Sequence, residues 1–354
     1  MKHPSIYIRG LRQVDHTVFC VSQGQKVYRD PATGRQLPYS SGQQVKRSIM
    51  DTLVGALGEN RAPITFNFTL AGKDGKKVLS NDEPWSPCDP TYADQLIGGW
   101  MRAGKGSAPV KRRSPLSISA MRPLHPSLAN IASEAVTFDR SDESEAHIAR
   151  VVDEKGIELT REAVAEFLSE TGRNLPMRLW IPEDKVGGRA TGLFVFDVAI
   201  DLATLFSVSL YDYEPEISTE VKQKLLEAGW ITSPDGLRLL CPPAKREAII
   251  DALAEGLVEW RITSNQSRTL SLQNTLAIAI SENANHIGTA IRADLTEQSD
   301  FQKAAAVLDT TAGATVYTAK TALAWIPGAD ATADALEAAK ADLKARLLAY
   351  DYEA

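Results

Sequence analysis

The sequence predicts an α+β protein, because strand-like segments alternate with single helical segments and long stretches with neither pattern separate them. A doubly wound parallel sheet would place a helix after nearly every strand, and this chain lacks that regularity. The length of 354 residues fits either two domains or one core that carries large insertions.

Short-range patterns predict the first elements. Ser5 to Leu11 is rich in β-branched and aromatic residues and predicts a strand. Thr17 to Ser22 either continues that strand across a bulge or forms a second one. Ser40 or Ser41 is suited to cap a helix whose apolar residues recur at helical spacing until a glycine ends it. Ile64 to Leu70 alternates strictly between apolar and polar residues and is the clearest strand of the first hundred residues.

The later elements follow from the same reasoning. We expect strands over Leu116–Met121 and Ala135–Arg140, and then an inserted helical segment over residues 141–185. Gly192 to Ile200 is almost continuously apolar, which predicts a central strand of the core. The remaining expected elements are two amphipathic helices, an apolar strand and a final helix, over residues 218–228, 243–260, 270–280 and 333–350.

These patterns divide the chain into one core with two insertions. The expected segments are the first part of the core, a basic flexible insertion, a pair of core strands, a helical insertion, and the remainder of the core with its C-terminal helix, over residues 1–70, 71–115, 116–140, 141–189 and 190–354.

Composition excludes several classes of protein. Hydrophobic residues make up 44% of the chain and charged residues 24%, which excludes wholesale disorder. The three cysteines, Cys20, Cys88 and Cys241, are odd in number and far apart, which excludes a disulfide framework and favours a reducing compartment. The chain shows no signal-peptide core and no apolar stretch near the roughly 18 residues of a membrane span. We therefore expect a cytoplasmic protein with no membrane segment.

Charge is distributed unevenly along the chain. Residues 1–122 hold 18 Lys and Arg against 9 Asp and Glu, and residues 123–354 hold 21 against 36. No acidic residue occurs between Gln95 and Ser133. Such a basic region favours the binding of a polyanion, and the alternative is a basic loop that opposes an acidic patch on a neighbouring subunit.

No convincing active site is visible. The five histidines lack metal-ligand spacing, and the common phosphate-loop, dinucleotide and nucleophile-elbow motifs are absent, so no cofactor or metal is predicted. Asp197 and Asp201 lie four residues apart, and strand geometry points both to one side. A divalent-ion pair there stays open beside a strand-end capping role. His16 fits an ordinary polar residue better than a general base, and Cys20 fits a small buried hydrophobe.

Four stretches, in order along the chain, resemble the repeat-associated (RAMP) superfamily of CRISPR effector proteins, most of all the backbone subunits of Cascade-type complexes. RDPATGRQLPYSSGQQVKRSI (29–49) resembles the first loop and helix of the family, and KRRSPLSISAMRPL (111–124) resembles its basic segment leading into a strand. ATGLFVFDVAIDLATLF (190–206) is similar to a later core strand, and SNQSRTLSLQNTLAIAIS (264–281) is similar to the glutamine-arginine loop before the last core strand.

The resemblance implies a modified RNA-recognition-motif (ferredoxin-like) core with large inserted finger and thumb segments. It implies a non-catalytic backbone subunit that binds guide RNA along its sugar-phosphate backbone, stacks head to tail with copies of itself and presents the guide for pairing with target DNA. The expected partners are therefore guide RNA, target DNA through that pairing, further copies and other effector-complex subunits. Because guide sequences vary, such a subunit must bind phosphate and sugar, for which Lys and Arg are suited.

The RNA contacts that this reading selects are polar and basic side chains, each of which has a solvated surface role as its alternative. They are Arg9, Arg12, Ser41, Gln44, Lys46, Arg47, Lys111, Arg112, Arg113, Gln266 and Arg268. The amides at the start of the helix after Ser41 are expected to add a phosphate site. Trp100 and Met101 are suited either to wedge between bases or to lie in the core.

One departure from the family pattern bears on catalysis. RNA-cleaving relatives carry an aspartate shortly before the RDPxTG-like stretch, and this chain has Gly24 and Gln25 there. The nearest acid, Asp30, is placed to cap its own turn. We therefore expect a scaffold and not an enzyme. The alternatives are a metal-dependent ribonuclease on the same fold, using Asp30 or the Asp197 and Asp201 pair, and an unrelated cytosolic enzyme or assembly protein.

Overall fold

A computed structural model describes the chain over residues 4–19, 25–73, 76–104, 107–132, 150–172, 175, 188–263, 270–297 and 303–353. The chain separates into two compact units, one formed by Met1–Ile131 with Arg189–Ala354 and the other by Ala132–Gly188. In the second unit, helix α3 (Arg161–Thr171) is capped by Thr160 and buries none of its side chains. Among the described residues, no helix has the length and apolar character to cross a bilayer.

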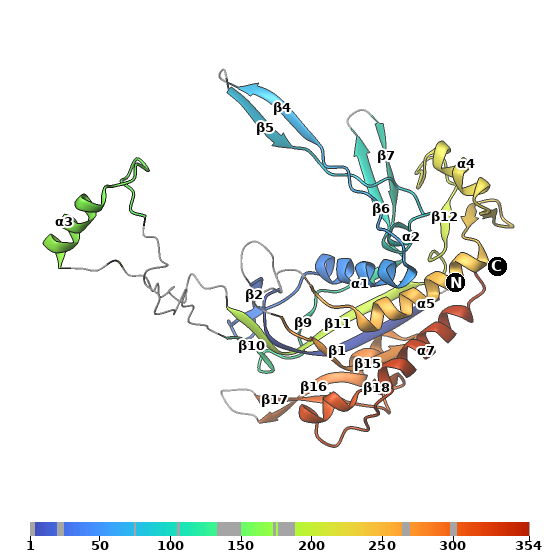
Figure 1. The fold of residues 1–354 in the computed structure, drawn as a ribbon. Coiled ribbons are helices and arrows are strands. Elements are labelled where there is room, and N and C mark those ends of the chain that lie inside the picture. Colours follow the sequence, from blue (N-terminus) through green and yellow to red (C-terminus); the bar gives the residue numbers. More distant parts are fainter. Residues whose placement is uncertain are drawn as a thin grey trace. The chain divides into compact units, whose positions relative to one another are not determined.

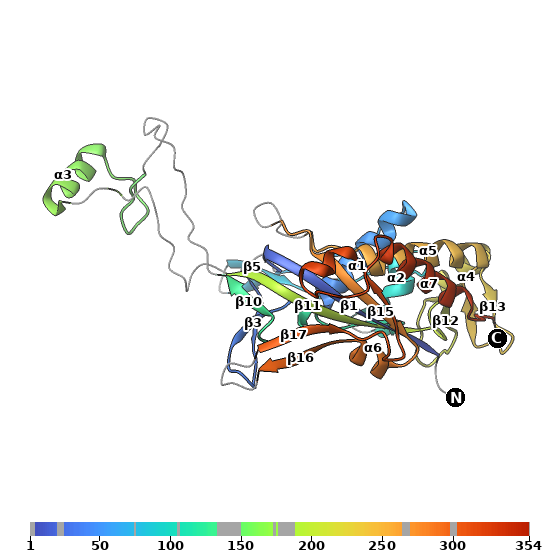
Figure 2. The same ribbon diagram turned by 90° about the horizontal axis from the view of Figure 1, so that it is seen from below.

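The first unit is built on an antiparallel sheet (Figures 1 and 2). Its central strand β1 (Ser5–Thr17) lies between β11 (Arg189–Asp201) and β15 (Asn274–Ser281). On the other side of β11 lie β8 (Leu116–Ile118), β9 (Arg122–Pro123) and β10 (Ala129–Ala132), and β18 (Thr315–Thr318) pairs with β15.

Two helices complete the connectivity of this core. Helix α1 (Gly42–Leu57) follows β1 and precedes β8, and α5 (Pro243–Glu259) follows β11 and precedes β15. The strand order β8-β11-β1-β15 with these two crossovers is the β-α-β-β-α-β connectivity of a ferredoxin-like core. The predicted α+β class is therefore confirmed.

The two faces of the sheet form separate apolar cores. On one face, residues such as Ile8 and Phe196 pack with α1, α5 and α7 (Ala335–Leu348). On the other, residues such as Leu11 and Val195 pack with α6 (Ala284–Ala290) and the 3₁₀ helix η2 (Lys320–Ala324). Successive residues of a strand point to opposite faces of the sheet. Arg12 therefore points to the face that α1, α5 and α7 cover, and Arg9 points to the face that α6 and η2 cover.

The remaining elements are short. Four two-stranded ribbons are β2 (Val27–Arg29) with β3 (Gln36–Pro38), β4 (Phe68–Lys73) with β5 (Lys76–Asn81), β6 (Trp100–Gly104) with β7 (Ser107–Arg112), and β16 (Ile291–Glu297) with β17 (Lys303–Leu308). A small sheet contains β12 (Ser207–Ser209), β14 (Arg238–Leu240) and β13 (Ile231–Thr232). Two further helices are α2 (Ala93–Gly98) and α4 (Thr219–Glu227).

Local sequence explains the start of the chain well. Ser41 caps α1 by accepting a hydrogen bond from the Gln44 amide, and Gly58 ends the helix in the left-handed region at φ 66°. Strand β1 ends at Thr17, after an irregularity between Val14 and Thr17. Val18 and Phe19 are not part of a strand, and the rest of the segment predicted over Thr17–Ser22 lies outside the described residues.

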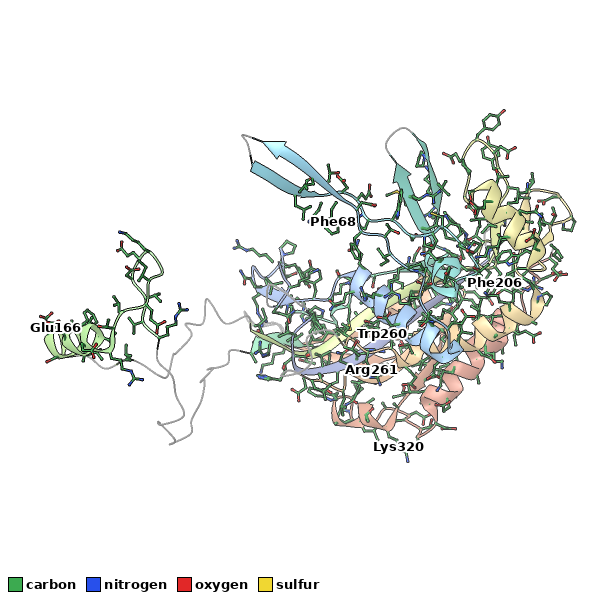
Figure 3. The ribbon with its side chains drawn as sticks, turned by 45° about the horizontal axis from the view of Figure 1, so that its top comes forward. Phe68, Glu166, Phe206, Trp260, Arg261 and Lys320 are labelled. Carbon is green, nitrogen blue, oxygen red and sulfur yellow. The ribbon has the colours of Figure 1, made fainter. Side chains whose placement is uncertain are left out.

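The alternating segment Ile64–Leu70 differs from a core strand. Strand β4 begins only at Phe68. The apolar side chains of the segment stay outside the core, with Phe66 66% and Leu70 61% exposed. Figure 3 shows Phe68 on this ribbon, away from Trp260 in the core. The alternation is real, but no second layer covers its apolar side among the described residues. The strand expected over Ala135–Arg140 lies outside the described residues.

Candidate nucleic-acid interface

The basic tract, defined here as residues 111–124, runs along the side of β11 that faces away from β1. Strand β8 pairs with the end of β11, and β9 pairs with its middle. Between them, Met121 exchanges backbone hydrogen bonds with Ser40, just before α1, at 2.9 and 3.0 Å. The tract is therefore held between the sheet and the N-terminus of α1.

The N-terminus of α1 lies directly against this tract. A Cβ at Gly42 would come within 2.9 Å of the carbonyl oxygen of Ile118, so only glycine allows this approach. The hydroxyl of Ser40 is 3.0 Å from Oε1 of Gln44, and Ser41 caps the helix. The first turn carries no acidic side chain. The partial positive charge at the N-terminus of α1 is therefore not offset by a carboxylate of the same turn.

Lys46, which the sequence reading selects as an RNA contact, makes hydrogen bonds within the chain. Its Nζ donates to the carbonyl oxygen of Gly98 at 2.6 Å and to Oγ of Ser114 at 2.8 Å. Burial, together with the nearby charge of Arg112, lowers the pKa of Lys46 to about 8. This ammonium group fastens α1 to the base of the β6–β7 ribbon, and its contact with RNA stays a prediction.

Arg112 is also an internal cation. It is 4% exposed, and its guanidinium donates to the carbonyl oxygens of Leu96, Thr204 at 2.6 Å and Ser207 at 3.2 Å. Burial lowers its pKa to about 10, despite the nearby carboxylate of Glu216. A side chain with these contacts cannot lie on the RNA surface, so this prediction is wrong.

Arg12 is fully buried on the face of the sheet that α1, α5 and α7 cover. It donates to the carbonyl oxygens of Trp260 at 2.7 Å and Val258 at 3.3 Å, and its guanidinium lies 3.8 Å from the Trp260 ring centroid. Burial lowers its pKa well below the usual value. The contact predicted for Arg12 is wrong as well, because the side chain has no accessible surface.

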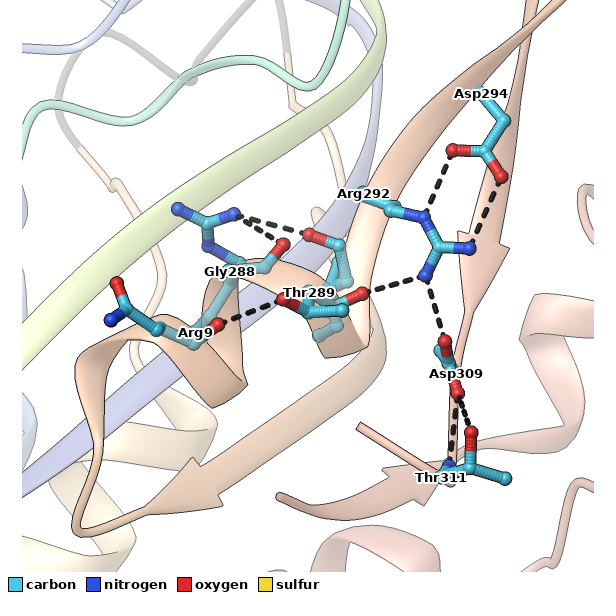
Figure 4. A network of polar contacts seen from close by, with 9 residues as sticks. Arg9, Gly288, Thr289, Arg292, Asp294, Asp309 and Thr311 are labelled. Atoms are coloured by element: carbon cyan, nitrogen blue, oxygen red, sulfur yellow. Dashed lines mark hydrogen bonds and ion pairs between the residues drawn. The ribbon is translucent and has the colours of Figure 1, made fainter. Parts of the chain in front are cut away.

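Arg9 lies on the opposite face, within a polar network (Figure 4). It pairs with Asp197 at 2.6 and 3.1 Å and donates to the carbonyl oxygens of Gly288 and Ile291 at 3.4 and 3.1 Å. Arg122 approaches the same carboxylate at 3.4 Å. Arg9 therefore holds the sheet to α6, and Arg122 is the more exposed member of this group at 44% against 17%.

The carboxylates considered for a metal pair have other roles. Asp197 faces two arginines, as described above, and Asp201 accepts from the Ala203 amide at 3.1 Å and the Thr204 hydroxyl at 3.0 Å. Asp30 accepts from the amide and hydroxyl of Thr33, which lowers its pKa. In the part of the chain that the structure describes, no group of three or more potential ligands lies close enough to hold a metal ion.

Four cations are exposed near the tract. Arg47 on α1 is 67% exposed and meets Asp51 only at 3.7 Å, and Lys111 meets Glu214 at 3.7 Å. Arg113 is exposed and enters no hydrogen bond or ion pair among the described residues. Arg122 completes the set. It was not selected from the sequence as a contact, although its place in the acid-free stretch is a usable signal.

Comparison with known proteins finds similar chains among solved structures. No family model and no curated protein sequence matches this chain. A chain of a solved structure titled "CRISPR RNA-guided surveillance complex, pre-nicking" is similar over 97% of this chain and 88% of its own length, with 10% identity and a TM-score of 0.45. A chain of a "CRISPR RNA-guided surveillance complex" is similar over 97% and 83%, with 10% identity and a TM-score of 0.39.

Two further predicted contacts, Gln266 and Arg268, lie outside the described residues, as does Cys20. Of the two residues considered as wedges, Trp100 is buried and donates from Nε1 to the carbonyl oxygen of Glu216 at 2.6 Å. Met101 is 55% exposed on β6. The aromatic ring therefore belongs to the core.

Proposed function

We propose that this chain is a non-catalytic, guide-RNA-binding backbone subunit of a Cascade-type CRISPR surveillance complex. The observation that carries the proposal is the basic tract itself, which is free of acidic residues, holds the exposed Arg113 and Arg122, and passes the N-terminus of α1 at Met121. Cations and helix amides bind phosphate without reading bases, as a variable guide requires. The four ordered sequence resemblances point to the same role.

Stacking of copies is part of this proposal. The β4–β5 ribbon exposes a row of apolar side chains, and Leu70 lies directly opposite Leu79 in the register, each 61% exposed. Apolar patches of this kind mark surfaces that a partner covers. In the proposed assembly a neighbouring copy covers this ribbon, which gives head-to-tail contacts.

A binding experiment with a charge-matched control tests the RNA-binding role. We expect the double variant Arg113→Gln, Arg122→Gln to bind unrelated single-stranded RNAs with equally reduced affinity. Its log–log salt slope should be lower by about 1.4 units, at roughly 0.7 per phosphate contact. The control Lys320→Gln, Lys344→Gln removes two exposed charges elsewhere and should leave both quantities unchanged (Lys320 is labelled in Figure 3). Equal slopes for the two variants would disprove the proposed interface.

A further inference from the structure

A cavity of 470 Å³ opens where the basic tract meets the end of β11. Its walls come from elements far apart in the sequence: the start of β1, the join between β7 and β8, the end of β11, and β12 and β14 of the small sheet. Residues Ala199 and Ser117 face each other across β11 and β8 on the face away from α1. This volume is large enough for one small ligand.

The lining is rich in hydroxyl groups and mixed in charge. Six of its side chains are alcohols, namely Ser5, Ser114, Ser117, Thr204, Ser207 and Ser209. Three arginines and two carboxylates leave one net positive charge. A single phosphodiester carries one negative charge, so the charge of the cavity matches one such group and is too small for a polyphosphate.

The charged groups divide into fixed and available ones. Arg112 is held by three backbone carbonyl oxygens, and Glu216 accepts from the Ser209 amide at 2.7 Å. Arg238 donates one N–H to the carbonyl oxygen of Ala203 at 2.6 Å, and its other N–H groups remain for a ligand. The side chains of Arg113 and Ser117 make no hydrogen bond or ion pair within the described part of the chain.

The acceptors in this cavity favour a ligand with hydroxyl groups. The two oxygens of Asp201 each accept one hydrogen bond, and a carboxylate has about four lone-pair sites, so further donors can be accepted. A phosphate alone offers no donor to these oxygens. A ribose offers a 2′-hydroxyl that both donates and accepts, whereas a deoxyribose at the same place would leave the remaining lone-pair sites of Asp201 without this donor.

We propose that this cavity holds one ribose-phosphate unit of a bound strand, with Arg113 and Arg238 at the phosphate and Asp201 and Ser117 at the sugar hydroxyl. The cavity is then the place where the chain distinguishes RNA from DNA. This inference rests on the proposed function, because it assumes that a strand lies along the basic tract.

The test compares a single-stranded RNA with a DNA of the same sequence, by fluorescence anisotropy on the full chain. We expect the wild-type protein to bind RNA at least about fivefold more tightly than DNA, because this ratio corresponds to the net free energy of one hydrogen bond. Ala199→Leu places three more carbon atoms in the cavity beside Ser117 and Asp201 and should bring the RNA-to-DNA ratio close to one while both strands still bind. Ala341→Leu adds the same side chain to an exposed position of α7 and should keep the wild-type ratio.

A second variant covers the case in which Ala199→Leu does not fold. Ser117→Val removes one hydroxyl from an exposed strand position, suits a β-strand, and should reduce the ratio. Equal binding of RNA and DNA by the wild type overturns the cavity proposal and leaves the proposed function standing, and so does an unchanged ratio in both variants. Failure to bind either strand overturns the proposed function and, with it, this inference.

Discussion

Lys46 donates from Nζ to Oγ of Ser114 at 2.8 Å, which ties the second turn of α1 to the join between β7 and β8. The neighbouring Arg47 points into solvent and makes only a long ion pair with Asp51. Two adjacent basic residues on one helix thus have opposite roles, one structural and one available for binding.

The first prediction separates these roles. Lys46→Met should lower the free energy of unfolding by about 1–2 kcal/mol, because the Gly98 carbonyl and the Ser114 hydroxyl lose their donor. Arg47→Ala should change it by no more than about 0.5 kcal/mol and should lower the salt slope of RNA binding by about 0.7 units. Urea titration and anisotropy measure the two effects. A reversed pattern, with Arg47 stabilising and Lys46 binding, would contradict the structure.

The second prediction concerns pH. The pKa of Lys46 is about 8 in the folded chain and 10.5 in a free lysine. Between these values the unfolded chain holds more protons on this amine than the folded chain, so the Lys46 contribution to the free energy of unfolding rises with pH. The difference between wild type and Lys46→Met should therefore shift in favour of wild type from about pH 7.5 to about pH 9.5. Taking the difference in the free energy of unfolding between the two proteins cancels the contributions of the other titrating groups. A difference that stays constant with pH would contradict the burial of this amine.

The third prediction concerns Arg12. Arg12→Ala should lower the free energy of unfolding by about 3 kcal/mol, because two buried carbonyl oxygens lose a donor and a cavity opens beside Trp260. RNA affinity measured where the variant is still folded should equal that of wild type. A stable variant with weakened RNA binding would place Arg12 on the interface after all.

The fourth prediction concerns catalysis. RNA bound to the assembled protein should remain intact in magnesium or manganese, because Asp30 is engaged by Thr33 and Asp197 faces Arg9 and Arg122. Gel analysis of end-labelled RNA gives the measurement. Metal-dependent cuts that disappear in Asp30→Ala would establish a nuclease instead.

The fifth prediction concerns assembly. Without RNA, the protein should be monomeric or form irregular oligomers, since head-to-tail contacts do not close into a symmetric dimer. Replacing Phe68 and Leu70 with serine should reduce RNA-driven assembly in sedimentation experiments. Both side chains are exposed, so the free energy of unfolding should change little. A stable closed dimer that RNA does not affect would argue against stacking.

The sequence predicted the elements whose signals are local. Cap residues set the bounds of α1, and the apolar run of β11 marked a central strand of the sheet. The roles of individual arginines were not predictable, since they depend on distant backbone groups. Arg12 meets carbonyl oxygens some 250 positions along the chain, and Arg112 meets Thr204 and Ser207. The local sequence around a basic residue does not show whether its side chain points to solvent or into the core.

The buried cations also affect how quickly a strand is captured. The excess of 18 basic over 9 acidic residues in residues 1–122 includes Arg12 and Arg112, which have almost no contact with solvent, and Arg9, which is neutralised by Asp197. Long-range attraction of a polyanion depends on charges at the surface, so the steering field is smaller than the count suggests. It is concentrated around Arg47, Lys111, Arg113 and Arg122. Association should therefore begin at the basic tract and slow steeply with added salt, while the dissociation rate depends on the close contacts made afterwards.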